Sequence, residues 1–221
     1  MPLLHLLAGS NGAGKSTYAR DVLIPVTALP FINADEIALE RWPDAQAEHA
    51  YEAARIAETQ RRERIALQQS FITETVFSHP SKVKLVSDAV DAGYLVHLHI
   101  VIVPVELAVQ RVTERVRRGG HGVPEEKIRA RYERVWTHLA TAIDIADVVD
   151  VFDNGSARIP FRPCARFTHG TLIGPASWPK WAPAALTNAG GTAGHTTPTH
   201  ERIQPQRVEP ERRPVRPKRK D

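Results

Sequence analysis

At residues 9–16 the chain reads Gly9-Ser10-Asn11-Gly12-Ala13-Gly14-Lys15-Ser16, which fits the pattern G-x-x-x-x-G-K-S/T at every position. An apolar run over residues 3–8 precedes this stretch and a helical pattern over residues 15–24 follows it, which is the context that the pattern requires. Its glycines let backbone N–H groups approach a phosphate. A helix that starts near Lys15 directs the positive end of its dipole at the same anion. The stretch therefore predicts a loop that binds a nucleoside triphosphate.

Two side chains of this phosphate loop have expected roles in the chemistry. Lys15 would reach the β- and γ-phosphates of ATP, and the hydroxyl of Ser16 would be a ligand of Mg²⁺. The expected cofactors are therefore ATP and Mg²⁺. The residues of this region that we expect to contact the nucleotide are Gly9, Ser10, Asn11, Gly12, Ala13, Gly14, Lys15, Ser16 and Thr17.

Along the rest of the chain, short apolar runs alternate with helical patterns. This alternation indicates an α/β fold, P-loop NTPase or kinase-like, with a mostly parallel sheet flanked by helices. We expect Pro25 to end the first helix, because proline lacks the N–H that a helix interior requires. Strands are predicted at residues 3–8, 30–33, 71–73, 94–103 and 148–152, helices at residues 15–24, 44–69, 81–92, 105–118 and 124–143, and an edge hairpin at residues 158–173.

The composition excludes several classes of protein. The 221 residues are 42% hydrophobic and 24% charged, close to globular averages, so a fibrous or wholly disordered chain is excluded. The single cysteine, Cys164, allows no internal disulfide, and no clustered Cys/His spacing indicates a zinc site. No run of about 18 apolar residues occurs, so we expect no membrane association and a cytoplasmic location.

The basic character of the chain is concentrated at its end. Residues 201–221 carry eight Lys or Arg and four acidic residues, which accounts for the whole net charge of +4. The body is therefore neutral, and we do not expect the fold to bind nucleic acid. We predict a folded domain at residues 1–174 and a basic, disordered tail rich in proline and glycine at residues 175–221. Trp178 and Trp181 are the tail residues that could dock back on the domain.

Further segments follow the phosphate loop in a fixed order. They are Phe31-Ile32-Asn33-Ala34-Asp35-Glu36, Phe71-Ile72-Thr73-Glu74-Thr75, Gly93-Tyr94, Arg111-Val112, Arg115-Val116-Arg117-Arg118-Gly119-Gly120-His121-Gly122-Val123-Pro124, Arg131-Tyr132 and Asp153-Asn154. In this order they resemble the zeta toxin family and its small ABC-type ATPase branch, although no Leu-Ser-Gly-Gly-Gln signature occurs. The similarity covers roughly residues 3–160 and is far more specific than the loop alone.

The resemblance implies a P-loop kinase fold and ATP-dependent phosphorylation of a small-molecule hydroxyl. In zeta toxins the acceptor is UDP-N-acetylglucosamine, so the resemblance suggests a nucleotide sugar as substrate and an antitoxin protein as partner. Asp35 matches the family's catalytic base, and Glu74 matches its glutamate near the substrate. The phosphate-binding arginine on the family's helix matches Arg111 or Arg115. In the expected lid, where the family has a second arginine, this sequence has His121 and no arginine.

On their own chemistry, Asp35 and Glu74 both follow predicted strands, at the edge of the sheet where phosphate would bind. A carboxylate at Asp35 can accept the proton of an attacking hydroxyl; the alternative is a cap for a helix over residues 36–41. Glu74 could hold Mg²⁺ through water or bind substrate, and the alternative is a satisfied carboxylate at the end of a strand.

Arg111, Arg115 and Arg118 are spaced i, i+4 and i+7, so they share one face of a predicted helix. Next to the glycine-rich break at residues 119–122, this spacing predicts a phosphate-clamping lid. We expect Arg111 and Arg118 to contact the nucleotide and Arg115 to stabilise the transferring group. The alternative is a solvated basic face, with Glu114 as a local partner of Arg118.

Other polar residues have simpler expected roles. Asp153-Asn154-Gly155 forms a turn after the last strand of the series, and the resemblance places the Asp-Asn pair near the nucleotide base. His97 and His99 alternate along a predicted strand, with backbone or interlayer roles.

Three functions fit the sequence. The leading hypothesis is an ATP-dependent small-molecule kinase in which Lys15, Asp35, Glu74 and Arg115 carry the reaction. A second is a P-loop ATPase whose basic tail holds nucleic acid. A third is a kinase that acts on another nucleotide or on an antibiotic hydroxyl.

Overall fold

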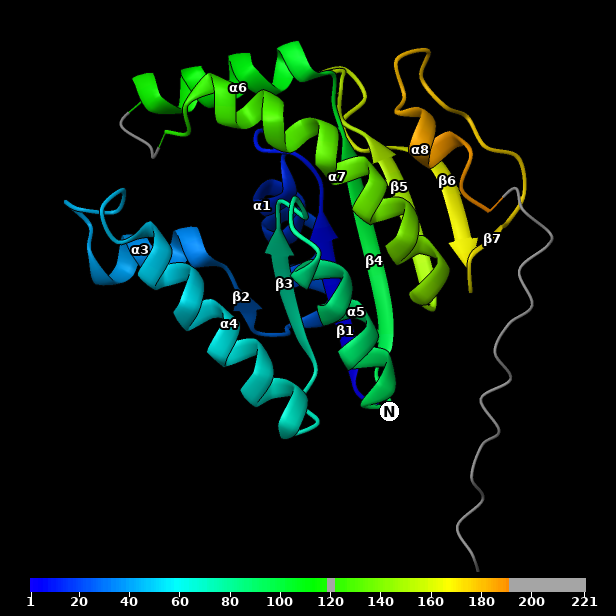
Figure 1. Ribbon diagram of the computed structural model, residues 1–221, viewed down its shortest axis with the longest axis horizontal. Helices are drawn as coiled ribbons and strands as arrows, with labels where there is room; N and C mark the ends of the chain where they lie inside the picture. The colour runs from blue at the N-terminus through cyan, green and yellow to red at the C-terminus, as the bar shows by residue number, and fades with distance from the viewer. Residues whose placement is uncertain (119–121, 191–221) are drawn as a thin grey trace, which may run out of the picture.

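A mostly parallel sheet forms the centre of the computed structural model, which describes residues 1–118 and 122–190 (Figure 1). Seven strands pair in the described part of the chain, in the order β2-β3-β1-β4-β5-β6-β7. The first five strands are mutually parallel, and β6 and β7 are antiparallel to their neighbours. The strands are β1 (Leu3–Ala8), β2 (Phe31–Ile32), β3 (Phe71–Thr75), β4 (Leu95–Ile102), β5 (Val148–Asp153), β6 (Arg162–Thr168) and β7 (Thr171–Leu172).

The position of β1 determines where a ligand can bind. The chain leaves β1 for β2 at one edge, returns to β3 beside β1, and then crosses to β4 on the other side. Leu7 of β1 is in register with Glu74 of β3 and with His99 of β4. Because the strand order reverses at β1, a crevice opens beyond the carboxyl ends of β1 and β3.

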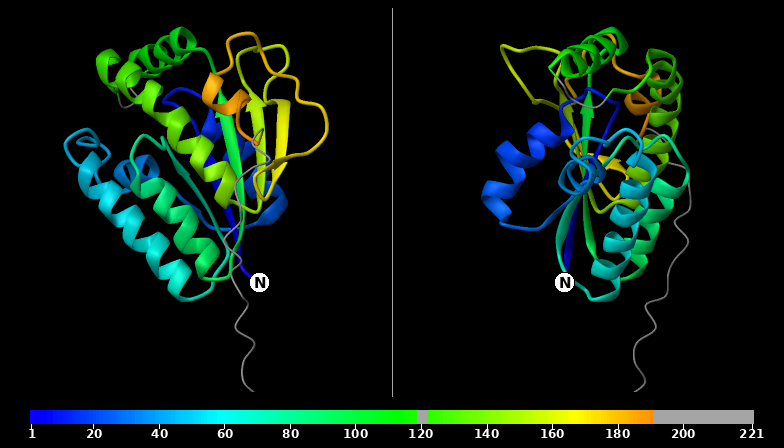
Figure 2. Two further views of the ribbon diagram at one scale, coloured as in Figure 1. Left: turned by 45° about the vertical axis from the view of Figure 1, so that its right-hand side comes forward. Right: turned by 90° about the vertical axis from the view of Figure 1, so that its left-hand side faces the viewer.

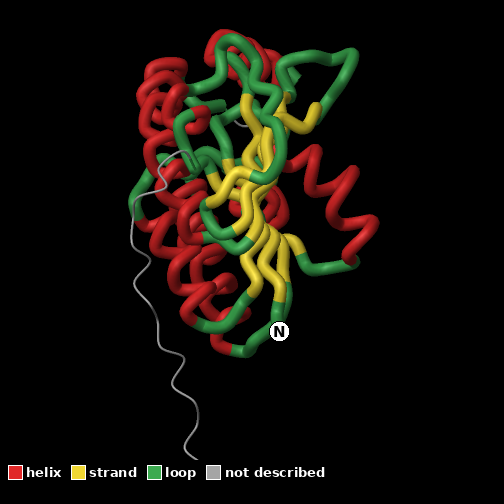
Figure 3. Tube along the Cα trace, turned by 90° about the vertical axis from the view of Figure 1, so that its right-hand side faces the viewer, coloured by secondary structure: helices red, strands yellow, loops and turns green. Residues whose placement is uncertain are grey.

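Helices cover the two faces of the sheet unequally. Most of them lie on one face, whereas the continuous segment α1-η1-α2 lies on the other (Figures 2 and 3). No helix in residues 1–118 or 122–190 is long and apolar enough to cross a membrane. The helices are α1 (Lys15–Tyr18), η1 (Ala19–Leu23), α2 (Ile24–Thr27), α3 (Ala34–Arg41), α4 (Ala50–Ala66), α5 (Ser81–Asp91), α6 (Val105–Arg117), α7 (Glu125–Ile145) and α8 (Ala184–Thr187).

Alternation along β1 divides the core into two parts. Leu4 and Leu6 point to the face covered by α5 and α7, where Leu139 of α7 is also fully buried. Leu7 points to the opposite face and packs with Tyr18 of α1. Successive side chains of a strand point to opposite faces, so one short apolar strand contributes to both layers.

The expected α/β fold with a mostly parallel sheet flanked by helices is confirmed, and so is the hairpin at the sheet edge, formed by β6 and β7. Pro25 does not end the first helix, which continues to Thr27. The preceding turn is π-helical, and the N–H of Ile24 bonds five residues back to the carbonyl of Ala19. A wider turn of this kind accommodates a proline ring that offers no N–H.

The helix predicted from residue 44 begins only at Ala50. Residues 43–49 form turns instead, and the rings of Trp42 and His49 stack with their centroids 4.4 Å apart. Pro43 disfavours helical geometry in the residue before it, which explains why α3 ends at Arg41 with Trp42 outside the helix.

The segment after Gly174 packs on the domain instead of leaving it. Helix α8 lies on α7, and its Leu186 is fully buried. Trp178 and Trp181 pack against the main core, each partly buried. The packed structure therefore continues past the boundary expected at residue 174, because two indoles and a leucine supply apolar surface that the proline-rich composition concealed. The basic part of the predicted tail, residues 191–221, lies outside the described residues.

Candidate functional site

The phosphate loop turns sharply between the end of β1 and the start of α1. Gly9 and Gly14 have φ values of +144° and +97°, which side chains rarely adopt. A Cβ atom on Gly9 would lie 2.3 Å from the carbonyl oxygen of Val101, and one on Gly14 would lie 2.5 Å from Nδ2 of Asn154. Both glycines are therefore required by backbone shape and by the close approach of neighbouring elements.

Lys15 lies folded over the phosphate loop. Its ammonium group donates to the carbonyl oxygen of Ser10 at 3.0 Å, and only 7% of the residue is exposed. Burial lowers the pKa of Lys15, and the carboxylates of Glu74 and Asp35 oppose that shift. The lysine is thus a buried cation held close to the backbone N–H groups that would receive a phosphate.

Glu74 lies at the carboxyl end of β3, beside the strand that leads into the phosphate loop. Its Oε2 atom is buried and has no hydrogen-bond partner among the described residues. Burial raises the pKa of Glu74, against the lowering effects of the Lys15 charge and a hydrogen bond from Ser16. This differs from a satisfied carboxylate at a strand end and is compatible with a ligand for a cation or a substrate hydroxyl.

Asp35 is positioned by its neighbour. The side chain of Asn33 caps helix α3 by accepting from the backbone N–H of Asp35 at 2.8 Å. The cap role that was the alternative for Asp35 therefore belongs to Asn33, and the Asp35 carboxylate does not cap the helix, with its side chain 61% exposed. Its Oδ2 atom lies 3.8 Å from Nη1 of Arg115. Asp35 and Arg115 face each other from α3 and α6.

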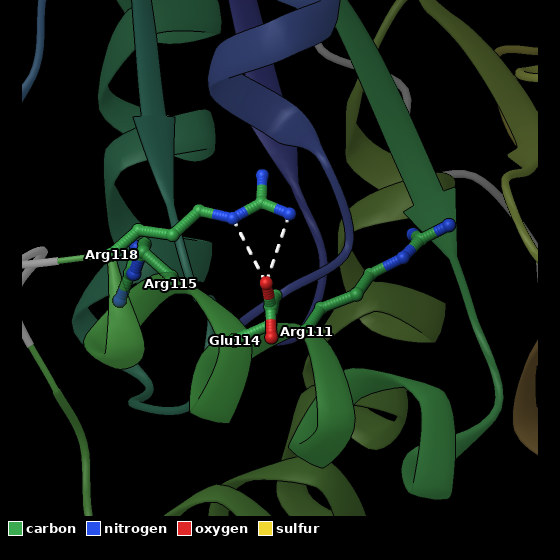
Figure 4. A pocket seen from close by; sticks show the side chains of 4 residues that line it. All are labelled: Arg111, Glu114, Arg115 and Arg118. Carbon is green, nitrogen blue, oxygen red and sulfur yellow. Dashed lines mark hydrogen bonds and ion pairs between the residues drawn. The ribbon is translucent and has the colours of Figure 1, made fainter.

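Arg111 and Arg115 of α6 and Arg118, which directly follows that helix, point in different directions (Figure 4). Arg111 donates to the carbonyl oxygen of Asn154 at 2.9 Å and to that of Gly12 at 3.4 Å. Arg118 is paired with Glu114 at 2.9 Å, as the local-partner alternative proposed. A phosphate clamp made by all three side chains therefore stays a prediction.

Two cavities meet at this helix. Arg111, Glu114, Arg115 and Arg118 line a pocket of about 400 Å³ (Figure 4). A larger cleft of about 1140 Å³ contains the phosphate loop, Asp35, Glu74, Arg111 and Arg115. Arg118 does not line that cleft, so its contact with a nucleotide stays a prediction. His121, expected in the lid, lies outside the described residues.

Asn154 supports the phosphate loop in a way that the sequence did not indicate. Its Nδ2 atom donates to the carbonyl oxygen of Ala13 at 2.8 Å. Its backbone N–H donates to the carbonyl oxygen of Ile102. Its own carbonyl accepts from Arg111, and the residue is buried. The turn predicted here does form, since Asp153 Oδ1 accepts from the N–H of Gly155 at 2.7 Å. The turn signal was readable, whereas the contact with the loop needed the fold.

Two basic side chains from α4 and α5 also line the cleft, close to Glu58. Arg61 of α4 is buried there and donates to the hydroxyl of Thr73 at 3.5 Å. Lys82 of α5 lines the same cleft, and burial, followed by repulsion from Arg61, lowers its pKa. Sequence reasoning missed this pair, because Arg61 lies in a helix whose many charged residues read as a solvated surface. Only its position at i+4 from the buried Ala57 marked it as inward-facing.

The chain was compared with known proteins. A family model described as Zeta toxin matches residues 1–160. An uncharacterized protein of Haemophilus influenzae is 30% identical over 128 residues, which is 56% of this chain and 88% of the relative.

Solved structures show the same fold at low sequence identity. A chain from the PezAT chromosomal toxin-antitoxin system of Streptococcus pneumoniae has a TM-score of 0.50 and 15% identity, over 69% of this chain and 68% of its own. A chain of the AvrRxo1-ORF1:-ORF2 complex has a TM-score of 0.64 and 16% identity, over 78% of this chain and 60% of its own. A chain of the same complex with ATP has a TM-score of 0.62 and 17% identity, over 78% of this chain and 60% of its own. This chain thus spans about 60% of that relative's length.

Proposed function

The chain belongs to the zeta toxin family, and on that premise we propose that it is an ATP-dependent kinase that transfers the γ-phosphate to a hydroxyl group of a small molecule. The observation that carries this proposal is the position of Asp35. Its carboxylate does not cap the helix, lies in the same cleft as the phosphate loop, and faces Arg115 at 3.8 Å. A base close to bound phosphates, with a cation beside it, is the arrangement that phosphoryl transfer requires.

The residues present fit ATP and Mg²⁺. The glycines of the phosphate loop leave the space that side chains would fill, and Ser10 Oγ, Asn11 Oδ1 and Glu74 Oε2 are buried without partners among the described residues. The loop and Lys15 would hold the triphosphate, while Ser16 and Glu74 would hold the metal ion. When bound, ATP supplies the phosphoryl group and Mg²⁺ neutralises charge on the phosphate oxygens.

The chain's own residues then have separate tasks. Asp35 accepts the proton of the acceptor hydroxyl as that oxygen attacks phosphorus. Lys15 and Arg115 stabilise the negative charge that develops on the transferring group. Arg111 and Asn154 keep the loop in shape, through bonds to Gly12 and Ala13 respectively. ATP use would place this reaction in the cytoplasm.

The acceptor in this proposal is anionic, because Arg61 and Lys82 line the cleft and outnumber the neighbouring Glu58. A nucleotide sugar such as UDP-N-acetylglucosamine carries both the required hydroxyls and a diphosphate that these two cations would bind. A partner protein is also part of the proposal, since two of the similar structures come from a toxin-antitoxin system and a two-protein complex.

A transfer assay with labelled γ-phosphate tests the proposal. A panel of nucleotide sugars, nucleotides and neutral sugars is offered to the wild type, to Asp35→Asn and to the control Asp21→Asn, whose exposed carboxylate lies on η1. We expect transfer to an anionic acceptor, with Asp35→Asn slower by about 10²–10⁴-fold and ATP binding retained. The control should match the wild type.

Two results would contradict the proposal. Activity within a few-fold of wild type in Asp35→Asn would remove the base from the mechanism. ATP hydrolysis stimulated by DNA or RNA, with no labelled acceptor formed, would favour the ATPase with a nucleic-acid-binding tail.

A further inference from the structure

Three histidines gather on the sheet face that carries α1-η1-α2, opposite the main layer of helices. His5 comes from β1, and His97 and His99 come from β4, two residues apart on the same side of the strand. One nitrogen of each ring lies within 4.8 Å of the corresponding nitrogens of the other two. His5 is directly in register with His97. The parallel pairing of two strands thus places three imidazoles side by side.

The contacts within this histidine cluster leave ring nitrogens without partners. Nδ1 of His5 and Nε2 of His99 lie 2.9 Å apart, so one donates to the other. His5 Nε2 and His99 Nδ1 are buried and have no hydrogen-bond partner in the described structure. When the 2.9 Å pair turns its lone pairs to an ion, these outer nitrogens carry the ring protons, so the ion would replace the hydrogen bond between the two rings.

Asp150 and Arg166 complete the surroundings of the histidine cluster. Oδ2 of Asp150 lies 2.8 Å from Nε2 of His97. The same carboxylate accepts from Arg166 at 2.6 and 3.0 Å, which balances its charge. A carboxylate that accepts from one nitrogen of a histidine directs the lone pair of the other nitrogen, the arrangement found behind metal-bound histidines.

We propose that His5, His97 and His99 bind one divalent transition-metal ion of the Zn²⁺ class, with Asp150 as the residue that orients His97. Imidazole nitrogens favour this class over Mg²⁺, which takes oxygen ligands. Three protein ligands leave a fourth position for water. The site is separate from the nucleotide cleft, whose lining includes none of these histidines.

The geometry and the burial support this assignment. Metal–nitrogen bonds of about 2.0–2.1 Å place two tetrahedral ligands roughly 3.4 Å apart. The 2.9 Å pair would therefore open by a few tenths of an ångström, and the wider separations, which reach up to 4.8 Å, would close. The His97 side chain is 22% exposed, which gives an ion a route in from solvent.

Sequence inspection could not find this site. Zinc sites are usually recognised from ligands at short, regular spacings along the chain. Here His97 and His99 form a short pair, but the third ligand lies more than 90 residues earlier and reaches them only through the pairing of β1 with β4.

Calorimetric titration of the full-length, chelator-treated protein with Zn²⁺, in excess Mg²⁺, tests the proposal. We expect one ion per chain and a higher melting temperature when Zn²⁺ is bound. Titration with Co²⁺ should give the visible absorption of a four-coordinate site. His97→Ala should weaken Zn²⁺ binding by at least about 100-fold, and Asp150→Asn by about 10–100-fold.

The control is His79→Ala, since that histidine is exposed on the loop before α5. Thermal unfolding without metal shows that each variant folds, and His5→Gln serves as a second ligand variant. The proposal is overturned if the wild type binds no Zn²⁺, or if binding persists unchanged in both His97→Ala and His5→Gln, which would place the ion elsewhere in the chain.

Discussion

Strand β1 carries two polar regions of very different origin. Beyond its carboxyl end lies the phosphate loop, built from eight consecutive residues. Near its start lies His5, whose cluster is completed by residues of β4 more than 90 positions later. The first region is specified locally and can be read along the chain, whereas the second exists only once the strands have paired. Sequence signals are therefore strong where function needs contiguous residues and weak where it needs neighbours in space.

The largest effect should come from the contiguous region. Lys15→Ala removes the buried cation over the phosphate loop. We expect kcat to fall by at least about 10²–10³-fold, because developing charge on the phosphates loses its fixed partner. ATP affinity measured by calorimetry should fall as well. Lys84→Ala, on the exposed side of α5, is the matched control, and unchanged turnover in Lys15→Ala would show that the loop is not the nucleotide site.

Residues 175–190 were expected from their composition to be part of a disordered tail, but they pack on the domain. Their contribution to stability can be tested by truncation. Truncation after Gly174 removes the fully buried Leu186 and the partly buried Trp178 and Trp181. Burial of one leucine contributes about 1.5–3 kcal/mol, so the melting temperature should fall by at least about 5 °C.

The control for that truncation is a chain that ends at Gly190, which lacks only residues outside the described structure. It should melt like the full-length protein. Equal melting temperatures for all three chains would show that the segment contributes nothing to the domain.

A smaller effect is expected at Asn154, because the phosphate loop, although contiguous in sequence, is supported by this distant residue. Asn154→Ala leaves the carbonyl of Ala13 without its 2.8 Å hydrogen bond. An unpaired buried acceptor costs about 1–3 kcal/mol, which denaturant unfolding would measure, and ATP affinity should weaken. Asn188→Ala, at an exposed position after α8, is the control. No change in stability or affinity would mean that the loop keeps its shape without this support.

The smallest effect concerns pH. Burial raises the pKa of Glu74 above its value in the unfolded chain, so the folded state binds more protons and the stability of the wild type falls as pH rises through that window. Glu74→Gln should be at least as stable as the wild type at neutral pH, and this advantage should shrink as pH falls through the raised folded-state pKa toward the unfolded value. Denaturant midpoints from neutral pH to pH 4 measure this, and a constant difference would contradict the buried, charged carboxylate.

The particular successes and failures of the sequence predictions have physical reasons. The strands and most helices were predictable, because apolar alternation and Gly or Pro punctuation act over a few residues. The cap at Asn33 and the support from Asn154 were not, since both depend on which of several polar groups the fold brings into contact. The burial of Arg61 could not be predicted for the same reason, because the sequence of a charged helix does not distinguish a buried arginine from a surface arginine.

The central place of β1 also affects how the protein is made. This strand leaves the ribosome before all the others in the sheet, but its first partner is Phe71 on β3 and its second is on β4. At roughly 5–20 residues per second, the apolar strand waits about 3–12 s for a neighbour. Nascent chains would thus expose Leu-Leu-His-Leu-Leu-Ala, without a partner strand, during that interval.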